Sequence, residues 1–260
     1  MTAKRRGNLD WEGAGGTTMI GWRARLGFLV PPGNPTVEAE MMALAPIGVS
    51  LHFHRMAVGG GVPGALDNQD ERTRTMIDSL DASVALLAMV KPDIIVVAHT
   101  ATSYYLGRPR EAELLARLSE ASGTRIVTAF GSVVAALERL GVRRVALGAP
   151  YSPETTAQGH AHLERHGFTV VRSENLKGVT NIYDETAERA YGLARMVDRP
   201  EAEAVFLSGT GMPTLPVLEL LEEDLRKPAI SSASAMMWHA LRSCGVHQPI
   251  PGYGRLLTLE

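Results

Sequence analysis

The sequence has 260 residues, of which 45% are hydrophobic and 21% are charged, and its formal net charge is -2. This composition is typical of a soluble globular protein and gives no indication of a nucleic acid or an anionic membrane as a partner. The single cysteine, Cys244, excludes an internal disulfide. We therefore expect a cytoplasmic protein whose partner is a small molecule.

The first 21 residues differ in composition from the rest of the chain. They carry Lys4, Arg5 and Arg6 and then become polar and rich in glycine, where a signal peptide would need an apolar stretch. We expect residues 1–21 to form a disordered N-terminal extension. No apolar run approaches the roughly 20 residues that a membrane-spanning helix requires, so no membrane partner is expected.

Short apolar runs alternate with helical patterns along the remaining chain, which predicts an α/β fold with parallel sheets. Similar units in the two halves predict two pseudo-symmetric lobes, each a mostly parallel sheet flanked by helices, with the active site between them. The first lobe is expected to contain residues 22–128 and 229–260, and the second residues 129–228. The expected strands are residues 25–30, 49–55, 94–98, 125–128, 144–147, 169–173, 204–207 and 229–231. The expected helices are residues 36–44, 71–90, 111–122, 131–140, 155–166, 184–197, 216–224 and 233–242.

Two junctions between a strand and a loop have a similar design in the two halves. Residues 94–103 and 205–214 each run from apolar β-formers into a loop of small hydroxyl and glycine residues. Such loops offer backbone N–H groups and hydroxyls to a small anion at the carboxyl ends of strands. The pair of junctions therefore predicts a shared cleft that binds a small carboxylate.

Several polar residues near these loops have two interpretations. Asn34 and Thr36 precede a predicted helix, where they could bind a carboxylate or cap the helix. Asn181 could likewise bind a carboxylate or cap a helix. Tyr151 follows a strand, so its phenol either points into the cleft or packs on the adjacent proline turn.

His99 ends an apolar strand and is the only strong proton carrier in the two loops. An imidazole titrates near neutral pH and can give or take a proton. The alternative is a buried histidine that only hydrogen-bonds to the backbone, and the sequence does not choose between these roles.

Metal and nucleotide sites are not supported. His52 and His54 share one face of a strand, and His162 and His166 are one helical turn apart, but neither pair has an acidic or cysteine partner at a recognisable spacing. The glycine-rich residues 59–61 lack the ending of a phosphate loop. We expect no metal and no organic cofactor.

Taken together, these loops resemble the aspartate/glutamate racemase superfamily, within it the branch of maleate cis-trans isomerase and arylmalonate decarboxylase. The resemblance spans nearly the whole chain after residue 22. Residues 207–215 and 227–242 are its most specific markers. The others are residues 30–38 and 100–107, Pro150, Tyr151 and Asn181.

The resemblance implies a two-lobed enzyme that acts on a small carboxylate without a cofactor, and it suggests a homodimer or a higher homo-oligomer. Enzymes of this group use cysteines, and His99 and Gly209 stand where the two cysteines would be. A thiolate mechanism is therefore not expected. We expect catalysis to involve His99 as the proton carrier, together with Thr100 and Tyr151, which the resemblance places where the decarboxylase holds its carboxylate. The expected substrate-binding residues are Asn34, Thr36, Ser103, Asn181, Gly209, Thr210 and Gly211.

Three functional hypotheses follow from the sequence. The first is a lyase, such as a decarboxylase, that stabilises an enediolate-like intermediate and uses His99 as the proton carrier. The second is a hydrolase in which His99 activates water against a small amide or ester acid. The third is a protein that binds a small acid without turnover. Maleate isomerase or racemase activity is the least expected outcome, because the two thiols are absent.

Overall fold

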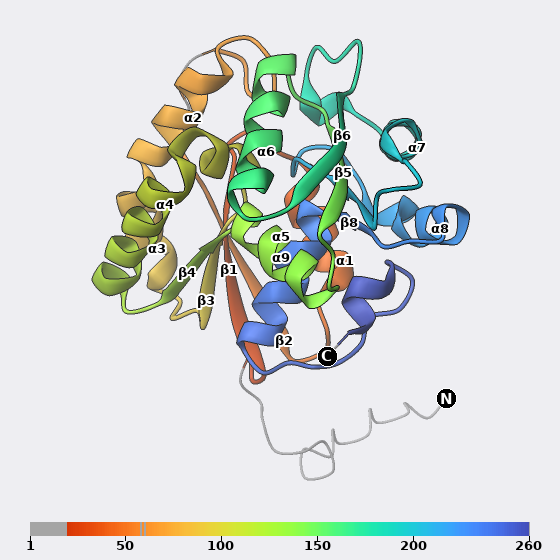
Figure 1. Ribbon diagram of the computed structural model, residues 1–260. Helices are drawn as coiled ribbons and strands as arrows, with labels where there is room; N and C mark the ends of the chain where they lie inside the picture. The colour runs from red at the N-terminus through yellow and green to blue at the C-terminus, as the bar shows by residue number, and fades with distance from the viewer. Residues whose placement is uncertain (1–19, 58, 60, 260) are drawn as a thin grey trace, which may run out of the picture.

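The computed structural model describes residues 20–57, 59 and 61–259, and Figure 1 shows them as two adjacent sheets with helices around and between them. The expected N-terminal extension, residues 1–21, lies outside the described residues except for Ile20 and Gly21. Among the helices of the described ranges, none combines the length and the apolar character needed to cross a membrane.

Each sheet consists of four parallel strands. The first has the order β2-β1-β3-β4 and the second the order β6-β5-β7-β8, so the two sheets repeat one topology. The expected α/β fold with two related lobes is confirmed. The strands are β1 Ala24–Val30, β2 Val49–Arg55, β3 Ile94–Val97, β4 Arg125–Thr128, β5 Arg144–Ala149, β6 Thr169–Asn175, β7 Ala204–Leu207 and β8 Ala229–Ser231.

Helices cover the sheets in layers. Helices α1 and α5 both pack on α9 between the two sheets, and α9 contacts both β3 and β8. Helices α3 and α4 pack on the outer face of the first sheet, and α6, α7 and α8 pack on the second. The α-helices are α1 Thr36–Leu44, α2 Gln69–Asp78, α3 Leu80–Ala88, α4 Thr100–Ser122, α5 Ala129–Arg139, α6 Pro153–Arg165, α7 Ala187–Val197, α8 Leu215–Leu225 and α9 Ser232–Ser243.

Strand β3 shows how the sequence produces these layers. Its four residues are all buried, as expected for a central strand of a parallel sheet that has helices on both faces. Because side chains alternate along a strand, Ile94 and Val96 join the core between the sheets. Ile95 and Val97 join a second core beneath α2, α3 and α4.

Two helices differ from the sequence expectation. Residues 71–90 form two helices that meet at Ser79, whose hydroxyl donates to the Met76 carbonyl and so competes with the backbone ladder. The helix expected at residues 111–122 begins earlier, at Thr100. It contains a kink at Gly107, where φ is 69° and ψ is 162°, two residues before Pro109.

The C-terminal strand also differs from the expected lobe assignment. Residues 229–260 were assigned to the first lobe, but β8 pairs with β7 and extends the second sheet. Helix α9, which follows, packs against α1 and α5. The C-terminal region therefore connects the two lobes.

The strand order determines where a ligand can bind. In an open parallel sheet, the loops on either side of the point where the strand order reverses leave a crevice at the carboxyl ends. In the first sheet, these loops follow β1 and β3. In the second sheet, they follow β5 and β7. The loop after β3 consists of Ala98 and His99, and the loop after β7 contains Gly209.

Candidate active site

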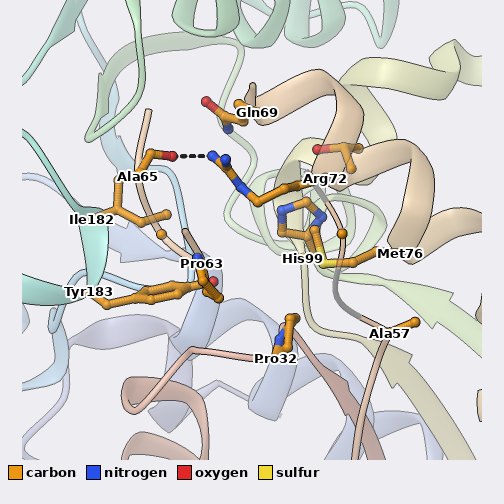
Figure 2. A pocket seen from close by; sticks show the side chains of 13 residues that line it. Pro32, Ala57, Pro63, Ala65, Gln69, Arg72, Met76, His99, Ile182 and Tyr183 are labelled. Atoms are coloured by element: carbon orange, nitrogen blue, oxygen red, sulfur yellow. Dashed lines mark hydrogen bonds between the residues drawn. The ribbon is translucent and has the colours of Figure 1, made fainter. Parts of the chain in front are cut away.

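A cavity lies at the carboxyl end of the first sheet and is closed on one side by residues of the second lobe. It encloses about 410 Å³, including the solvent space at its mouth. Figure 2 shows its lining, which consists of Pro32, Ala57, Gly59, Pro63, Gly64, Ala65, Gln69, Arg72, Thr73, Met76, His99, Ile182 and Tyr183.

His99 is the sequence-predicted residue that lines this cavity. It precedes α4, and its ring Nδ1 lies 3.0 Å from the Thr102 hydroxyl oxygen. Burial, with a smaller contribution from the positive charge of Arg72, lowers the pKa of His99 to about 4. The imidazole is therefore neutral at pH 7. Because Nδ1 is engaged with Thr102, Nε2 is the nitrogen that can exchange a proton with a ligand.

Thr100 and Tyr151 form a layer of hydroxyl groups behind the cavity wall. The Tyr151 hydroxyl hydrogen-bonds with the side chains of Thr100 and Ser208, and burial raises its pKa. The Thr100 hydroxyl donates to Ser232 at 3.0 Å. Neither Thr100 nor Tyr151 is solvent-exposed, and neither lines the cavity.

The turn after β7 lies against this layer. Gly209 has a φ of 94°, and a Cβ atom there would be 3.2 Å from the Tyr151 hydroxyl oxygen. The Thr210 hydroxyl donates to the Ala98 carbonyl at 2.9 Å, which places the turn beside the end of β3. A Cβ on Gly211 would be 2.7 Å from the Tyr183 ring, so this glycine permits close packing against a cavity residue.

Asn34 and Thr36 connect the two lobes. The Asn34 amide donates to Thr210, and its oxygen accepts the backbone N–H groups of Thr36 and Val37. The Thr36 hydroxyl donates to the Gly211 carbonyl at 2.7 Å. The amide of Asn34 thus has partners for both N–H groups and for both lone pairs of its oxygen, which leaves it no ligand-binding capacity in this conformation.

Asn181 and Ser103 also have partners within the protein. Asn181 begins a short 3-10 helix, Ile182–Asp184, where its side-chain oxygen accepts the Tyr183 N–H and its amide donates to the Pro63 carbonyl. The Ser103 hydroxyl donates to Glu111 at 2.7 Å. Neither side chain lines the cavity, so the structure places both in supporting positions.

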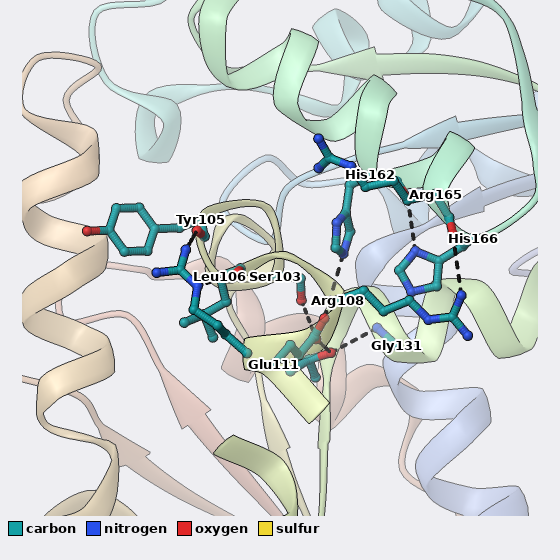
Figure 3. Close-up of polar contacts among 11 residues, drawn as sticks. Ser103, Tyr105, Leu106, Arg108, Glu111, Gly131, His162, Arg165 and His166 are labelled. Carbon is teal, nitrogen blue, oxygen red and sulfur yellow. Dashed lines mark hydrogen bonds and ion pairs between the residues drawn. The ribbon is translucent and has the colours of Figure 1, made fainter. Parts of the chain in front are cut away.

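Glu111 is a buried carboxylate of α4 that connects the beginning of this helix to the end of β4 and to α6 (Figure 3). It accepts the hydroxyls of Ser103 and Thr128, the latter at 2.6 Å. His162 of α6 places its Nε2 3.6 Å from the second carboxylate oxygen, within range of an electrostatic interaction but long for a hydrogen bond. Burial raises the pKa of Glu111, but these partners together bring it below its usual value.

Two of the histidines noted in the sequence bond to nearby protein groups. His52 bonds to the Ser50 hydroxyl, and His166 bonds to the backbone carbonyl of His162. Across the described ranges, no group of three or more His, Cys, Asp or Glu side chains is arranged to hold a metal ion.

Arg72 is the main cavity residue that the sequence analysis missed. It projects from α2 beside His99, and its side chain is buried. It lies one helical turn before Met76 and two turns before Leu80, both core residues. The sequence did contain a signal for Arg72, namely a cation on the apolar face of the predicted helix. Such a position is informative because arginine is rarely buried without a specific partner.

Cys244 lies far from this cavity in the fold. It caps the C-terminal end of α9, near Asp93 and Arg125 at the amino ends of β3 and β4. Burial raises the pKa of its thiol to about 11. His99, by contrast, lies at the carboxyl ends of the strands. The single thiol of the sequence and the imidazole are therefore at opposite ends of the strands of the first sheet.

The two parallel sheets and the cavity between their carboxyl ends define a two-lobed α/β protein with an interlobe site. Residues 26–257 match the family model of arylmalonate decarboxylase. The chain belongs to this family, which confirms the resemblance found in the sequence.

Two curated relatives and one solved structure show the extent of the similarity. A maleate isomerase of Nocardia farcinica is 31% identical, with 91% of this chain and 96% of that protein covered. An arylmalonate decarboxylase of Bordetella bronchiseptica is 28% identical, covering 89% of this chain and 95% of that protein. A mutant of a Nocardia farcinica maleate cis-trans isomerase, solved with a covalently bound succinylcysteine intermediate, gives a TM-score of 0.82 at 27% identity. That alignment covers 90% of this chain and 98% of the other.

Proposed function

We propose that this protein is a cofactor-independent enzyme of decarboxylase type that acts on a small carboxylate, with His99 as the proton carrier. Membership in a family of enzymes supports a catalytic role in general. The observation that carries the specific proposal is the imidazole of His99 in the wall of the interlobe cavity, whereas the only thiol of the sequence lies at the opposite sheet edge.

The proposed reaction is balanced without a cofactor. In a malonate-type substrate, the bond between the central carbon and one carboxylate breaks, and that carboxylate leaves as carbon dioxide. Its bonding electrons delocalise over the central carbon and the remaining carboxylate as an enediolate. His99 then donates one proton to the central carbon and regains a proton from water.

The charge state of His99 fits this role. In the unliganded protein the imidazole is neutral, because burial and Arg72 hold its pKa at about 4. A substrate carboxylate beside the ring would favour the protonated form and raise this pKa. The proton would then be present on His99 when the negative charge develops on the substrate.

The hydroxyl layer behind the cavity wall supports the reacting site from outside the lining. The hydroxyls of Thr100 and Tyr151 hydrogen-bond with each other, and the backbone turn at Gly209 packs against the Tyr151 hydroxyl. Because none of these residues lines the cavity, we assign Thr100, Tyr151 and the turn at residues 209–211 the role of positioning the wall next to His99.

Cis-trans isomerisation is the second candidate function, favoured by the 31% identity to a maleate isomerase. The solved isomerase with a succinylcysteine intermediate indicates a covalent thiol adduct in that protein. In this chain the cavity lining contains no cysteine. An isomerase here would therefore need a nucleophile other than a thiol.

The full-length protein should be incubated in heavy water with phenylmalonate, methylmalonate, maleate and maleamate. Carbon dioxide, fumarate and ammonia distinguish the lyase, isomerase and hydrolase reactions, and NMR detects deuterium at the product α-carbon. We expect carbon dioxide release with deuterium incorporation. The variant His99→Gln should lose this turnover and retain ligand binding by calorimetry, whereas the exposed-site control His247→Gln should behave as wild type.

Other outcomes would overturn the proposal. Fumarate formation that persists in His99→Gln would indicate an isomerase with a different reactive group. Ammonia release from maleamate would support the hydrolase. Binding of the acids without any product would indicate a binding protein.

A further inference from the structure

Three polar side chains of α2 face the cavity together. Gln69, Arg72 and Thr73 all belong to the cavity lining. Residues three and four apart lie on the same face of a helix, so this spacing directs the three side chains to one side of α2. Met76, one turn further, continues the same face and lines the cavity as well.

Arg72 is held in position by the backbone. Its guanidinium donates to the carbonyls of Ala65 and Asp67, and the exposed Asp67 carboxylate lies 3.9 Å away. Figure 2 shows the Arg72 side chain extending past the His99 ring toward the Ala65 carbonyl. Each terminal nitrogen of the guanidinium donates to a backbone carbonyl, so the group is fixed in place as a positive charge in the cavity lining.

The positive charge of Arg72 reaches both sides of the cavity. On one side it lowers the pKa of His99, although burial is the larger cause. On the other side it opposes the effect of burial on Tyr183, whose pKa is nevertheless raised to about 12. Charges interact more strongly in a buried site than in water, so an anion entering this cavity would be attracted to Arg72.

The rest of the lining leaves few other places for an anion. The wall opposite α2 contains Pro32, Pro63, Ile182 and the Tyr183 ring, which are apolar surfaces. Asn34, which the sequence offered as a carboxylate ligand, is saturated by protein partners, and Asn181 bonds to Pro63 and Tyr183.

We propose that Arg72, with Gln69 and Thr73 beside it, binds the non-reacting anionic end of the substrate and so determines its charge specificity. This inference rests on the proposed function for the position of the reacting carbon, which would lie at His99. The apolar wall would accept the substituent of the acid. The ligand class is a small acid with two carboxylates, one held at α2 and one next to His99.

The test compares pairs of ligands that differ in one charge. Malonate, maleate and succinate are titrated calorimetrically into the full-length protein, each beside its monoamide: malonamate, maleamate and succinamate. Wild-type protein should bind at least one dianion about 30-fold more tightly than its monoamide, the size expected for one charge-assisted interaction. Equal affinity within every pair, or no binding of any dianion at millimolar concentration, would overturn the inference.

Variants then assign the discrimination to Arg72. Arg72→Met should weaken dianion binding by about 30-fold while changing monoamide binding by less than about threefold. Arg72→Lys should restore part of the preference, because it retains the charge without the fork. The control Arg74→Met removes the neighbouring exposed cation of the same helix and should change neither affinity. Equal losses for dianion and monoamide in Arg72→Met would show that Arg72 only holds the backbone at Ala65.

This test is independent of turnover. Repeating the titrations in His99→Gln measures charge discrimination in a protein that cannot complete the proposed reaction. If wild-type protein shows no activity but the Arg72-dependent preference for dianions remains, the proposed function is wrong and the proposed role of Arg72 is supported. If activity is present but the preference is absent or independent of Arg72, only the proposed role of Arg72 is wrong.

Discussion

Glu40 of α1 accepts the backbone N–H of Thr214 at 2.6 Å, at the start of α8 in the other lobe. It also accepts the Leu215 N–H at 2.8 Å. A carboxylate from the first lobe thus satisfies N–H groups that a helix N-terminus leaves without internal partners. Burial raises the pKa of Glu40 to about 7, although these hydrogen bonds act in the opposite direction.

Glu40 should make the stability of the protein fall as the pH rises. The folded protein holds the Glu40 proton more tightly than the unfolded chain does between pH 4.5, the usual pKa of a glutamate, and about pH 7. The free energy of unfolding therefore decreases through this window and reaches its lower value above pH 7. Glu40→Gln keeps an acceptor for the two N–H groups and should be more stable than wild type by up to about 3 kcal/mol near pH 8.

Urea denaturation at a series of pH values measures this effect. The difference in unfolding free energy between Glu40→Gln and wild type should grow from acidic to alkaline pH. A constant difference would show that Glu40 does not titrate in this range.

The His99 imidazole should remain neutral through the physiological pH range in the unliganded protein. Its pKa is lowered from 6.5 to about 4, so the unfolded chain binds the proton better between these values. This histidine therefore contributes stability that is lost as the pH falls from about 6.5 to about 4. NMR titration of labelled imidazoles should show no His99 transition near neutrality, and Arg72→Met should move the transition upward. A His99 transition at the unperturbed value would contradict the assignment.

Glu111 should be more sensitive to truncation than to loss of charge. Glu111→Ala would leave the buried hydroxyls of Ser103 and Thr128 without their acceptor, and we expect a loss of about 2–4 kcal/mol. Glu111→Gln retains an acceptor oxygen and should cost less. The exposed control Glu113→Ala should stay within about 0.5 kcal/mol of wild type, as measured by chemical denaturation.

The pH dependence of Glu111 has the opposite sign to that of Glu40. Its folded pKa is below the usual value, so its charge stabilises the fold at neutral pH, and this contribution disappears as the pH falls through the folded pKa. Glu111→Gln should therefore lose stability at neutral pH and approach wild type in acid. An equal loss of stability in Glu111→Gln at all pH values would show that the destabilisation comes from the changed side-chain shape and not from the lost charge.

Gly209 should not tolerate a side chain. Its φ of 94° is unfavourable for other residues, and a Cβ would lie 3.1 Å from Pro150 as well as close to the Tyr151 hydroxyl. We expect Gly209→Ala to destabilise the protein by about 1–2 kcal/mol or more. The control Gly192→Ala adds a Cβ in the interior of α7 with no atom within 4 Å. It should be neutral or stabilising by up to about 1 kcal/mol in thermal or urea unfolding.

The sequence predicted much of the fold, because alternating apolar runs and turn residues determine strands locally. All eight strands of the described residues, including β1 and β8, lie within two residues of their expected bounds. The break at Ser79 was missed because the residues around it continue a helical pattern, and only the hydroxyl bond to Met76 distinguishes the two helices. The placement of β8 depends on pairing between distant segments, which local patterns do not contain.

The candidate site was predictable to a smaller extent. The position of His99 at the end of an apolar strand made it a candidate in the sequence, because parallel strands end at one edge, and in the structure His99 lines the cavity. Asn34 has a residue type that suits both ligand binding and capping, and its bonds to Thr210 across the lobes appear only in three dimensions. Arg72 was overlooked because a charged residue in a helix usually faces solvent.

The separation of Cys244 from the cavity has a consequence for chemical resistance. An enzyme that needs a thiolate loses activity when an alkylating agent or a peroxide modifies that sulfur. Here a raised pKa of about 11 keeps the sulfur protonated and unreactive, and any adduct would form at the amino ends of β3 and β4. Catalysis by this protein should survive iodoacetamide and hydrogen peroxide at doses that silence thiol-dependent relatives, whereas diethylpyrocarbonate, which modifies imidazoles, should abolish it.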